Sequence, residues 1–315
     1  MELKEEILKE LKKSEYISGE ELAKRLFVSR NSVWKAVKKL REEGYEISAM
    51  TNRGYCLKGD NDKISVGAIM RNATREREFY ILDEVSSTND YARQLALDGR
   101  DEAVVIAETQ KLGRGRLGRK FYSPKGCGLY MSILCRPRIN VELAPLITSY
   151  TAVATALAID SLCGAETKIK WVNDIYMNGK KLCGILTEAA FDFEGGTVDY
   201  VIIGIGINVT GREFPKDISD RASSIEKESG ARISRNDLAA AILNNMDGMT
   251  EKIGLKDYLN IYREKSNVIG RSVKVMYGNS SFDAEAIDID DNAALVVKTD
   301  DGVKKLNSGE VSIKI

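Results

Sequence analysis

The sequence predicts an α+β protein made of a small helical module with a hairpin, a mixed central domain and a small C-terminal β-barrel. Three changes of pattern along the 315 residues indicate this division. Helical repeats end in a hairpin near residue 58, β-branched runs alternate with helical stretches to residue 267, and short strands separated by Gly, Asn and Asp follow. At about 100–200 residues per domain, this length fits two or three domains. We therefore expect domains at 1–62, 63–267 and 268–315.

The N-terminal module has the pattern of three helices followed by two short strands. Ser18 with Glu21 is the capping box of the second helix, and Ser29 caps the third. Gly44 stands where a C-terminal cap belongs, and a turn at 51–54 joins the strands. This order of elements is the layout of a winged helix-turn-helix domain.

Residues 24–41 of this module contain seven basic residues and no acidic one, although Lys+Arg and Asp+Glu both number 47 in the chain. Such a local excess is expected of phosphate contacts. A solvated helix face, or a module that binds protein, would have the same charge pattern. Because layout and charge agree, we favour DNA binding. The residues expected to contact DNA are Ser29, Arg30, Asn31, Ser32, Lys35 and Lys38 on the third helix and Arg53 at the hairpin tip.

In the central region, we expect strands at 103–109, 128–136, 169–172, 181–191 and 199–209, and helices at 89–97, 143–162 and 235–253. In the C-terminal region, the strands are expected at 272–278, 281–289, 293–299 and 311–315. Four or five such strands in so short a segment are typical of a small barrel.

The chain contains no histidine. This excludes Ser-His-Asp and Cys-His nucleophilic catalysis, His-based zinc sites and imidazole as a general base. Chemistry must therefore use Lys, Arg, carboxylates, amides, hydroxyls, backbone groups or a bound ion. The five cysteines form no C-x-x-C pair, which favours free thiols in the cytoplasm.

We expect no membrane segment. The first thirteen residues alternate in charge and lack the apolar core of a signal peptide. The longest uncharged run, 143–159, contains Pro145 and several hydroxyl side chains, and it is shorter than the roughly 20 apolar residues that span a bilayer. Such a run is typical of a buried helix.

The densest motif is KLGRGRLGRK at 111–120, with five basic residues, three glycines and no acid. It matches G-x-G-x-x-G, but a Rossmann turn must lead into a helix, whereas Pro124 and Gly128 favour a loop followed by a strand. A protein kinase would need a histidine in its catalytic loop. The motif is either a basic surface loop or a loop that closes on a polyanion. In the second case, the contacts would come from Arg114, Arg116 and Arg119.

Five motifs in order resemble the biotin–protein ligase family. They are SSTND at 86–90, GRGRLGR at 113–119, KWVND at 170–174, GKKLCGIL at 179–186 and GIGIN at 204–208. With the N-terminal module, the chain is similar to the bifunctional members that join this ligase to a biotin-operon repressor. The resemblance covers essentially the whole length. Val172 and Phe121 depart from the Pro and Trp that are common in the family.

The resemblance implies a central α/β domain like that of class II synthetases and an SH3-like C-terminal barrel. It implies a two-step reaction, in which biotin and MgATP give biotinyl-5′-AMP and pyrophosphate and the acyl group passes to a lysine of a biotin carboxyl carrier domain. The other implied partners are a palindromic operator DNA and a second copy of the chain, in a homodimer promoted by ligand. Two alternatives remain: a ligand-sensing transcription factor with weak or lost ligase activity, and a lipoate or other acyl-protein ligase.

The resemblance also implies roles for individual residues. Lys181 and Arg116 would be catalytic, because joining a carboxylate to a phosphate brings two anions together; one unit charge at about 4 Å is worth about 4 kcal/mol at an effective dielectric of about 20. The biotin site would contain Ser87, Thr88, Asn89, Gln110, Arg114, Gly115, Arg116, Lys181, Gly184, Gly204 and Gly206. The nucleotide site would contain Arg116, Arg119, Trp171, Asn173, Asp174 and Asn208. Asp174 would also position either Mg²⁺ or the attacking amine. Ser87 or Thr88 would equally suit a helix N-cap, and Trp171 would equally suit the core. The cover of the adenine would come from residues 211–224.

Overall fold

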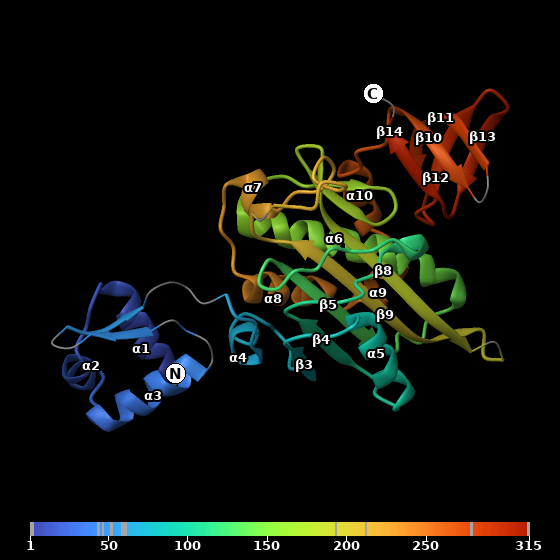
Figure 1. Cartoon of the computed structure of the whole chain (residues 1–315). Helices are drawn as coiled ribbons and strands as arrows, with labels where there is room; N and C mark the ends of the chain where they lie inside the picture. The colour runs from blue at the N-terminus through green and yellow to red at the C-terminus, as the bar shows by residue number, and fades with distance from the viewer. Residues whose placement is uncertain are drawn as a thin grey trace. The chain divides into compact units, whose positions relative to one another are not determined.

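The computed structural model describes residues 3–42, 45, 47–50, 53–57, 62–192, 194–211, 213–277 and 280–313. It forms two compact units, Met1–Ser65 and Val66–Ile315. Figure 1 draws the chain and labels most of its helices and strands.

The first unit has the predicted order of helices and strands. Its elements are α1 (Leu3–Lys13), α2 (Gly19–Arg25), α3 (Arg30–Glu42), β1 (Ile47–Met50) and β2 (Gly54–Leu57), with β1 and β2 antiparallel. The helices bury one apolar face each, around Ile7, Leu22 and Val37. Both predicted caps are confirmed: Ser18 Oγ accepts from Glu21 N, and Ser29 Oγ accepts from Ser32 N, each at 3.0 Å. The predicted cap at Gly44 and the first half of the turn at 51–54 lie outside the described residues.

The second unit is built on a mixed sheet with the strand order β3-β4-β5-β9-β8-β7-β6 through the described residues. The strands are β3 (Phe79–Leu82), β4 (Ala103–Ala107), β5 (Gly128–Cys135), β6 (Lys168–Lys170), β7 (Asp174–Met177), β8 (Lys180–Asp192) and β9 (Thr197–Asn208). β3 and β4 are parallel, and each of the other neighbouring pairs is antiparallel. The short turn between β7 and β8 and the long loop between β4 and β5 both carry predicted site residues.

Helices cover both faces of this sheet. On one face, α5 (Thr88–Leu97) packs Ala92 and Leu95 against Val105 of β4 and Leu134 of β5. On the other face, α6 (Ala144–Cys163) packs against α8 (Arg235–Met246) and the sheet. The shorter helices are α4 (Val66–Ile69), α7 (Ile225–Ser229), α9 (Met249–Leu255) and α10 (Tyr258–Glu264), with 3-10 turns at Arg116–Gly118 and Val141–Leu143.

Among the described residues, α6 with its preceding turn is the one helix long and apolar enough to cross a membrane. Most of it is buried inside the second unit, and its Ser149 hydroxyl bonds to the Tyr258 hydroxyl at 3.1 Å. The predicted buried helix is therefore confirmed.

The C-terminal segment is all-β, as predicted. Its antiparallel sheet has the order β13-β12-β11-β10-β14, formed by β10 (Arg271–Tyr277), β11 (Ser280–Ile289), β12 (Leu295–Thr299), β13 (Gly302–Leu306) and β14 (Glu310–Ile313). Its closure into an SH3-like barrel stays a prediction.

One predicted helix is wrong. The segment 235–253 is two helices, because Gly248 takes a left-handed conformation with φ of 70° between α8 and α9. Glycine adopts this conformation without the steric penalty of a side chain. Three short strands, β3, β7 and β13, were not predicted.

Candidate active site

One row of paired residues crosses the central sheet and joins predicted site residues from three strands. In order across the sheet, the row is Ala107, Tyr130, Gly206, Gly184 and Asp174. Neighbours in such a row are about 5 Å apart. Residues that are far apart in the sequence therefore lie side by side over a span of about 20 Å.

Gly204 and Gly206 lie on the same face of β9, because alternate residues of a strand face the same side, and this face has no side chain at these two positions. A Cβ at Gly204 would lie 2.2 Å from Asn89 Oδ1, and a Cβ at Gly206 would lie 2.6 Å from the Phe121 ring. Asn89 comes from the first turn of α5, and Phe121 from the loop between β4 and β5. The two glycines thus form a flat surface, here called the β9 floor, on which the Asn89 and Phe121 side chains lie closely.

Polar side chains from α5, β5 and the β4–β5 loop form a hydrogen-bonded cluster beside this floor. Gln110 Oε1 accepts from Thr88 N at 2.9 Å and from Thr88 Oγ1 at 3.2 Å. Ser132 Oγ lies 2.7 Å from Thr88 Oγ1 and 2.6 Å from Asn89 Oδ1. Asn89 Nδ2 donates to Glu188 at 2.7 Å. The cluster holds short donors and acceptors in a buried, fixed arrangement, which suits a small polar ring.

Charged groups gather at the other end of the row. Lys181 Nζ lies 2.6 Å from Asp174 Oδ1, and Gly184 is close enough that a Cβ there would lie 3.3 Å from the same Nζ. Burial lowers the pKa of Lys170; Asp174 raises this pKa again, and the positive charge of Lys181 lowers it further. The sheet therefore holds Lys170, Lys181 and Asp174 within electrostatic range of one another.

The glycine-rich loop is ordered by arginine contacts at both ends of this row. Arg114 pairs with Asp90 at the start of α5. Arg116 donates to Asn173 Oδ1 at 3.2 Å and to the Gly309 carbonyl of the C-terminal sheet at 3.0 Å. Arg119 pairs with Glu310 at 2.6 Å. The loop thus spans from the polar cluster to the charged end and is tied there to the C-terminal sheet.

The segment after β9 lies against the Lys181 backbone. Lys181 N donates to the Arg221 carbonyl at 2.8 Å, and Ser223 N donates to the Lys181 carbonyl at 3.0 Å. Asn208 Nδ2 donates to the Ser223 carbonyl at 3.0 Å. In the same segment, Phe214 packs edge-on against Tyr122, with 6.3 Å between ring centroids.

In the first unit, α3 presents a basic surface. Three basic residues of 24–41 are engaged within the unit, since Lys24 pairs with Glu20, Arg25 with Glu10 and Glu21, and Arg41 donates to the Ile47 carbonyl. The exposed face of α3 includes Arg30, Asn31, Lys35 and Lys38. Trp34 is 53% exposed on this helix, with Lys38 Nζ 5.9 Å from its ring centroid.

The chain is similar over its whole length to curated bacterial proteins. It is 36% identical to the bifunctional ligase/repressor BirA of Bacillus spizizenii over 95% of this chain and 94% of that protein. The chain belongs to the biotin protein ligase family. It is also 29% identical to the bifunctional ligase/repressor BirA of Escherichia coli, over 96% of this chain and 95% of that protein.

Family patterns and solved structures agree with this assignment. The Biotin/lipoate A/B protein ligase family matches residues 82–208, the HTH domain matches 4–56 and the Biotin protein ligase C terminal domain matches 268–314. The biotin protein ligase of Aquifex aeolicus in complex with biotin and ATP has a TM-score of 0.65 and 29% identity, covering 76% of this chain and 99% of that one. The predicted order of a helix-turn-helix domain, a biotin ligase catalytic fold and a C-terminal domain is confirmed.

The residues predicted for the site of this biotin protein ligase fall into separate groups in the structure. Around the polar cluster lie Ser87, Thr88, Asn89, Gln110, Arg114 and Gly204. Gly115 instead donates its N–H to the Arg119 carbonyl at 2.7 Å within the loop. Around Lys181 lie Arg116, Asn173, Asp174, Gly184, Gly206 and Asn208. Ser87 is the N-cap of α5 by position, but its side chain makes no capping hydrogen bond. Arg119 is directed to Glu310 of the C-terminal sheet.

Trp171 differs from the other predicted site residues. Its side chain is buried, and Nε1 donates to the Ala293 carbonyl of the C-terminal segment at 2.9 Å. The indole therefore takes the core position that was the alternative for this residue, and a role at the nucleotide stays a prediction.

Sequence reasoning did not single out Ser132, Lys170 or Trp34. Lys170 belongs to the KWVND motif, which was a usable signal. Ser132 was a polar residue in the middle of an apolar strand, also a usable signal, because a buried hydroxyl needs a partner. Trp34 gave no signal, since a tryptophan at helical spacing is more often buried.

The site of the ligase offers few groups for a metal ion. Among the described residues, no three His, Cys, Asp or Glu side chains are placed to hold one. Asp174 is a single carboxylate that already contacts Lys181. This fits Mg²⁺ arriving with ATP, since Mg²⁺ is commonly held by one or two carboxylates and substrate phosphates.

We predict that Gly204→Ala raises the KM for biotin by about tenfold, because overpacking that displaces Asn89 costs about 1–3 kcal/mol. Adenylate formation at varied biotin concentration measures this effect. Gly254→Ala is the matched control, since a Cβ at Gly254 has open space around it. Equal KM values for the two variants would contradict the role of Gly204.

Proposed function

We propose that the chain activates biotin with MgATP to biotinyl-5′-AMP and then transfers the biotinyl group to a lysine of a biotin carboxyl carrier domain. The β9 floor and the polar cluster would hold biotin. The polar groups of Thr88, Asn89 and Gln110 would form hydrogen bonds with its ureido ring. The carboxylate would then extend toward Lys181. The single observation that carries this proposal is the row from Tyr130 through Gly206 and Gly184 to Asp174, along which such a substrate would extend.

The charges at the end of this row suit the reaction. A carboxylate that attacks the α-phosphate needs fixed positive charge between the two anions. Lys181 is placed to neutralise the acyl-phosphate oxygens, and Asp174 orients its amine. Lys170 and Arg116 would add positive charge for the phosphates. The segment 211–224, whose Arg221 and Ser223 bond to the Lys181 backbone, would cover the nucleotide.

Incubation of the full chain with biotin, MgATP and a purified biotin acceptor domain, followed by an avidin blot, tests the ligase proposal. Label on the acceptor with release of pyrophosphate is expected. Absence of label, with biotin still bound, would favour the alternative of a ligand-sensing transcription factor without ligase activity. In a parallel reaction with lipoate in place of biotin, a lipoyl mass increase of the acceptor without any biotinylation would favour a lipoate ligase.

We also propose that the first unit binds operator DNA through α3 and represses genes of biotin metabolism. The contacts would come from Ser29, Arg30, Asn31, Ser32, Lys35, Lys38 and Arg53. Trp34 adds an apolar surface that can meet a thymine methyl group. One recognition helix offers too small a surface for tight selective binding, so we propose a homodimer that reads a palindromic operator.

Replacing Lys35 by Ala is expected to weaken binding to a random-sequence DNA duplex by about fivefold at low salt. It should also reduce the slope of log affinity against log salt concentration by about one, as for the loss of one phosphate contact. Lys9→Ala removes the same charge from the exposed side of α1 and is the control. Fluorescence anisotropy at several salt concentrations measures both. Equal effects of the two substitutions would indicate a general charge effect rather than a DNA-binding face.

Ligand and DNA binding should be coupled if the adenylate promotes the dimer. We predict that biotin with MgATP lowers the dimer dissociation constant by at least about tenfold relative to biotin alone, within the usual range of allosteric coupling. Sedimentation with no ligand, with biotin, and with biotin plus MgATP measures this. A DNA duplex that the chain selects from a random pool is then used to measure the DNA affinity under the same three conditions. Identical association in all three would leave a ligase with an independent DNA-binding domain.

The cytoplasm is the proposed location. All five cysteines are free thiols, which is usual in a reducing compartment. The proposed partners, a carrier domain and chromosomal DNA, are reached there.

A further inference from the structure

A buried arginine on α8 joins the two ends of the loop that carries the glycine-rich motif. Arg235 is the first residue of α8. Its Nη1 donates to Glu108 Oε2 at 2.8 Å and to the Gly128 carbonyl at 3.2 Å. Glu108 directly follows β4 and Gly128 begins β5, so residues 109–127 form the loop between these two contacts.

Hydrogen bonds next to this pair close the base of the loop. Thr109 Oγ1 donates to the Ser123 carbonyl at 2.8 Å, and Gln110 Nε2 donates to Ser123 Oγ at 3.1 Å. The other end of the same Gln110 amide accepts both hydrogen bonds from Thr88. The orientation of the Gln110 amide is therefore linked to the spacing of the two loop ends.

A contribution to the stability of the fold does not by itself explain the buried pair of Arg235 and Glu108. The side chains of Arg235 and Glu108 are 3% and 7% exposed, and desolvation of two buried charges can exceed their attraction. A guanidinium, however, presents several donors in a rigid plane. Arg235 can therefore hold a carboxylate from one chain segment and a carbonyl from another at the same time, which a lysine amine does less well.

We propose that Arg235 is a positioning residue for the glycine-rich loop. By holding Glu108 and the Gly128 carbonyl together, it fixes the loop ends, and through Gln110 it fixes the polar cluster at the start of α5. Its effect on substrate rests on the proposed ligase function, whereas its effect on loop order does not. Without it, substrate binding would have to order the loop, which weakens the apparent affinity.

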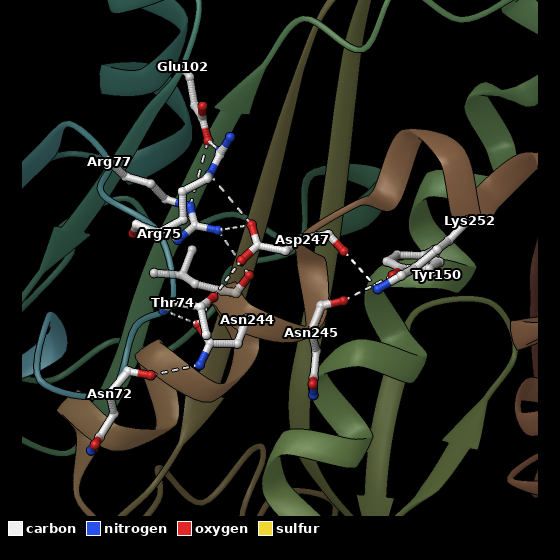
Figure 2. Close-up of polar contacts among 11 residues, drawn as sticks. Asn72, Thr74, Arg75, Arg77, Glu102, Tyr150, Asn244, Asn245, Asp247 and Lys252 are labelled. Carbon is white, nitrogen blue, oxygen red and sulfur yellow. Dashed lines mark hydrogen bonds and ion pairs between the residues drawn. The ribbon is translucent and has the colours of Figure 1, made fainter.

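A second buried arginine provides a matched control. Arg77 is also 3% exposed and pairs with Asp247, and both are part of the polar network in Figure 2. This network contains Glu102, just before β4, whereas Glu108 lies just after it. Six residues of extended chain separate the two carboxylates by about 20 Å. Arg77→Gln therefore removes a comparable buried charge away from the loop.

Hydrogen–deuterium exchange of the full chain tests the proposal directly. In Arg235→Gln, we expect peptides within 109–127 to exchange at least about tenfold faster than in the wild-type chain, because their local opening becomes easier. In Arg77→Gln, faster exchange should be confined to residues 72–77 and the C-terminal end of α8. Unchanged exchange of the loop in Arg235→Gln, or equal loosening in Arg77→Gln, would overturn the proposal.

Steady-state adenylate formation gives the functional readout. We expect Arg235→Gln to raise the KM for biotin by at least about fivefold with kcat within about twofold, as for a lost preorganisation of the site. Arg77→Gln should leave both values unchanged, and Arg235→Lys should restore part of the loss. If Arg235→Gln does not fold, Glu108→Gln and Arg235→Lys are measured in both assays in its place. A lower stability of these variants with normal loop exchange and normal KM would also overturn the proposal.

The two proposals fail in different ways. If the wild-type chain releases no pyrophosphate with biotin and MgATP, the proposed ligase function is wrong. The exchange comparison between Arg235→Gln and Arg77→Gln still decides whether Arg235 orders the loop.

Discussion

Substitution of Lys181 by Met or Gln is expected to lower the rate of biotinyl-5′-AMP formation by at least about a hundredfold, with the fold retained. The Lys181 amine lies 2.6 Å from Asp174, at the end of the row of paired residues that crosses the sheet. A neutral side chain cannot offset the charge that develops when the biotin carboxylate meets the α-phosphate. A loss of about 3 kcal/mol of transition-state stabilisation corresponds to this factor. Pyrophosphate release under saturating biotin and ATP measures the rate.

The adjacent lysine is the control for this measurement. The Lys180 side chain is half-buried, and its Nζ donates to the Asp220 carbonyl at 2.7 Å. Neighbouring residues of a strand face opposite sides of the sheet, so Lys180→Gln should leave adenylate formation within about threefold of the wild-type rate, as is usual for substitutions outside a site. A Lys181→Gln rate within twofold of the wild type would remove Lys181 from the mechanism.

Local sequence patterns correctly predicted helix caps and the longest apolar strand. The caps at Ser18 and Ser29 are short-range hydrogen bonds that depend on a few neighbouring residues, and both are present. The strand that became β9 was predicted within two residues, because its apolar run is long. The break at Gly248 was missed, since an isolated glycine within a helical pattern is often tolerated.

The motifs supplied a set of candidate site residues, but not how these residues contact one another. The pairing of Gly206 with Gly184 and then with Asp174 depends on the register of three strands. A one-residue slip would move these residues to the other face of the sheet. Register shifts between Ile175 and Tyr176 and between Ala190 and Phe191 change the pairing in a way that no motif indicates. The contact of Arg116 with Gly309 joins positions 193 residues apart. Such contacts follow from the packing of whole elements and could not be predicted from a motif.

The same long-range contact explains how the loop could retain a reactive intermediate. Arg116 reaches Asn173, next to Asp174, which pairs with Lys181, and also the Gly309 carbonyl, just before β14 of the C-terminal sheet. One side chain thus connects the glycine-rich loop, the site and the C-terminal sheet. A mixed anhydride such as biotinyl-5′-AMP must be shielded from water and from unrelated amines, and a closed loop provides this shield.

We therefore expect Arg116→Gly still to form biotinyl-5′-AMP but to release it early. Released adenylate would react with surface lysines of any nearby protein, so biotin should appear on serum albumin added to the reaction, at least about tenfold more than with the wild-type chain, as expected when a closing contact is lost. An avidin blot of a mixture of albumin and the acceptor domain measures both products. Lys111→Gly is the control, because Lys111 lies in the same loop but pairs with Glu84 on the surface, a contact of small energetic effect. If Arg116→Gly labels only the acceptor domain, or if Lys111→Gly labels albumin equally, retention of the adenylate does not depend on the Arg116 contacts.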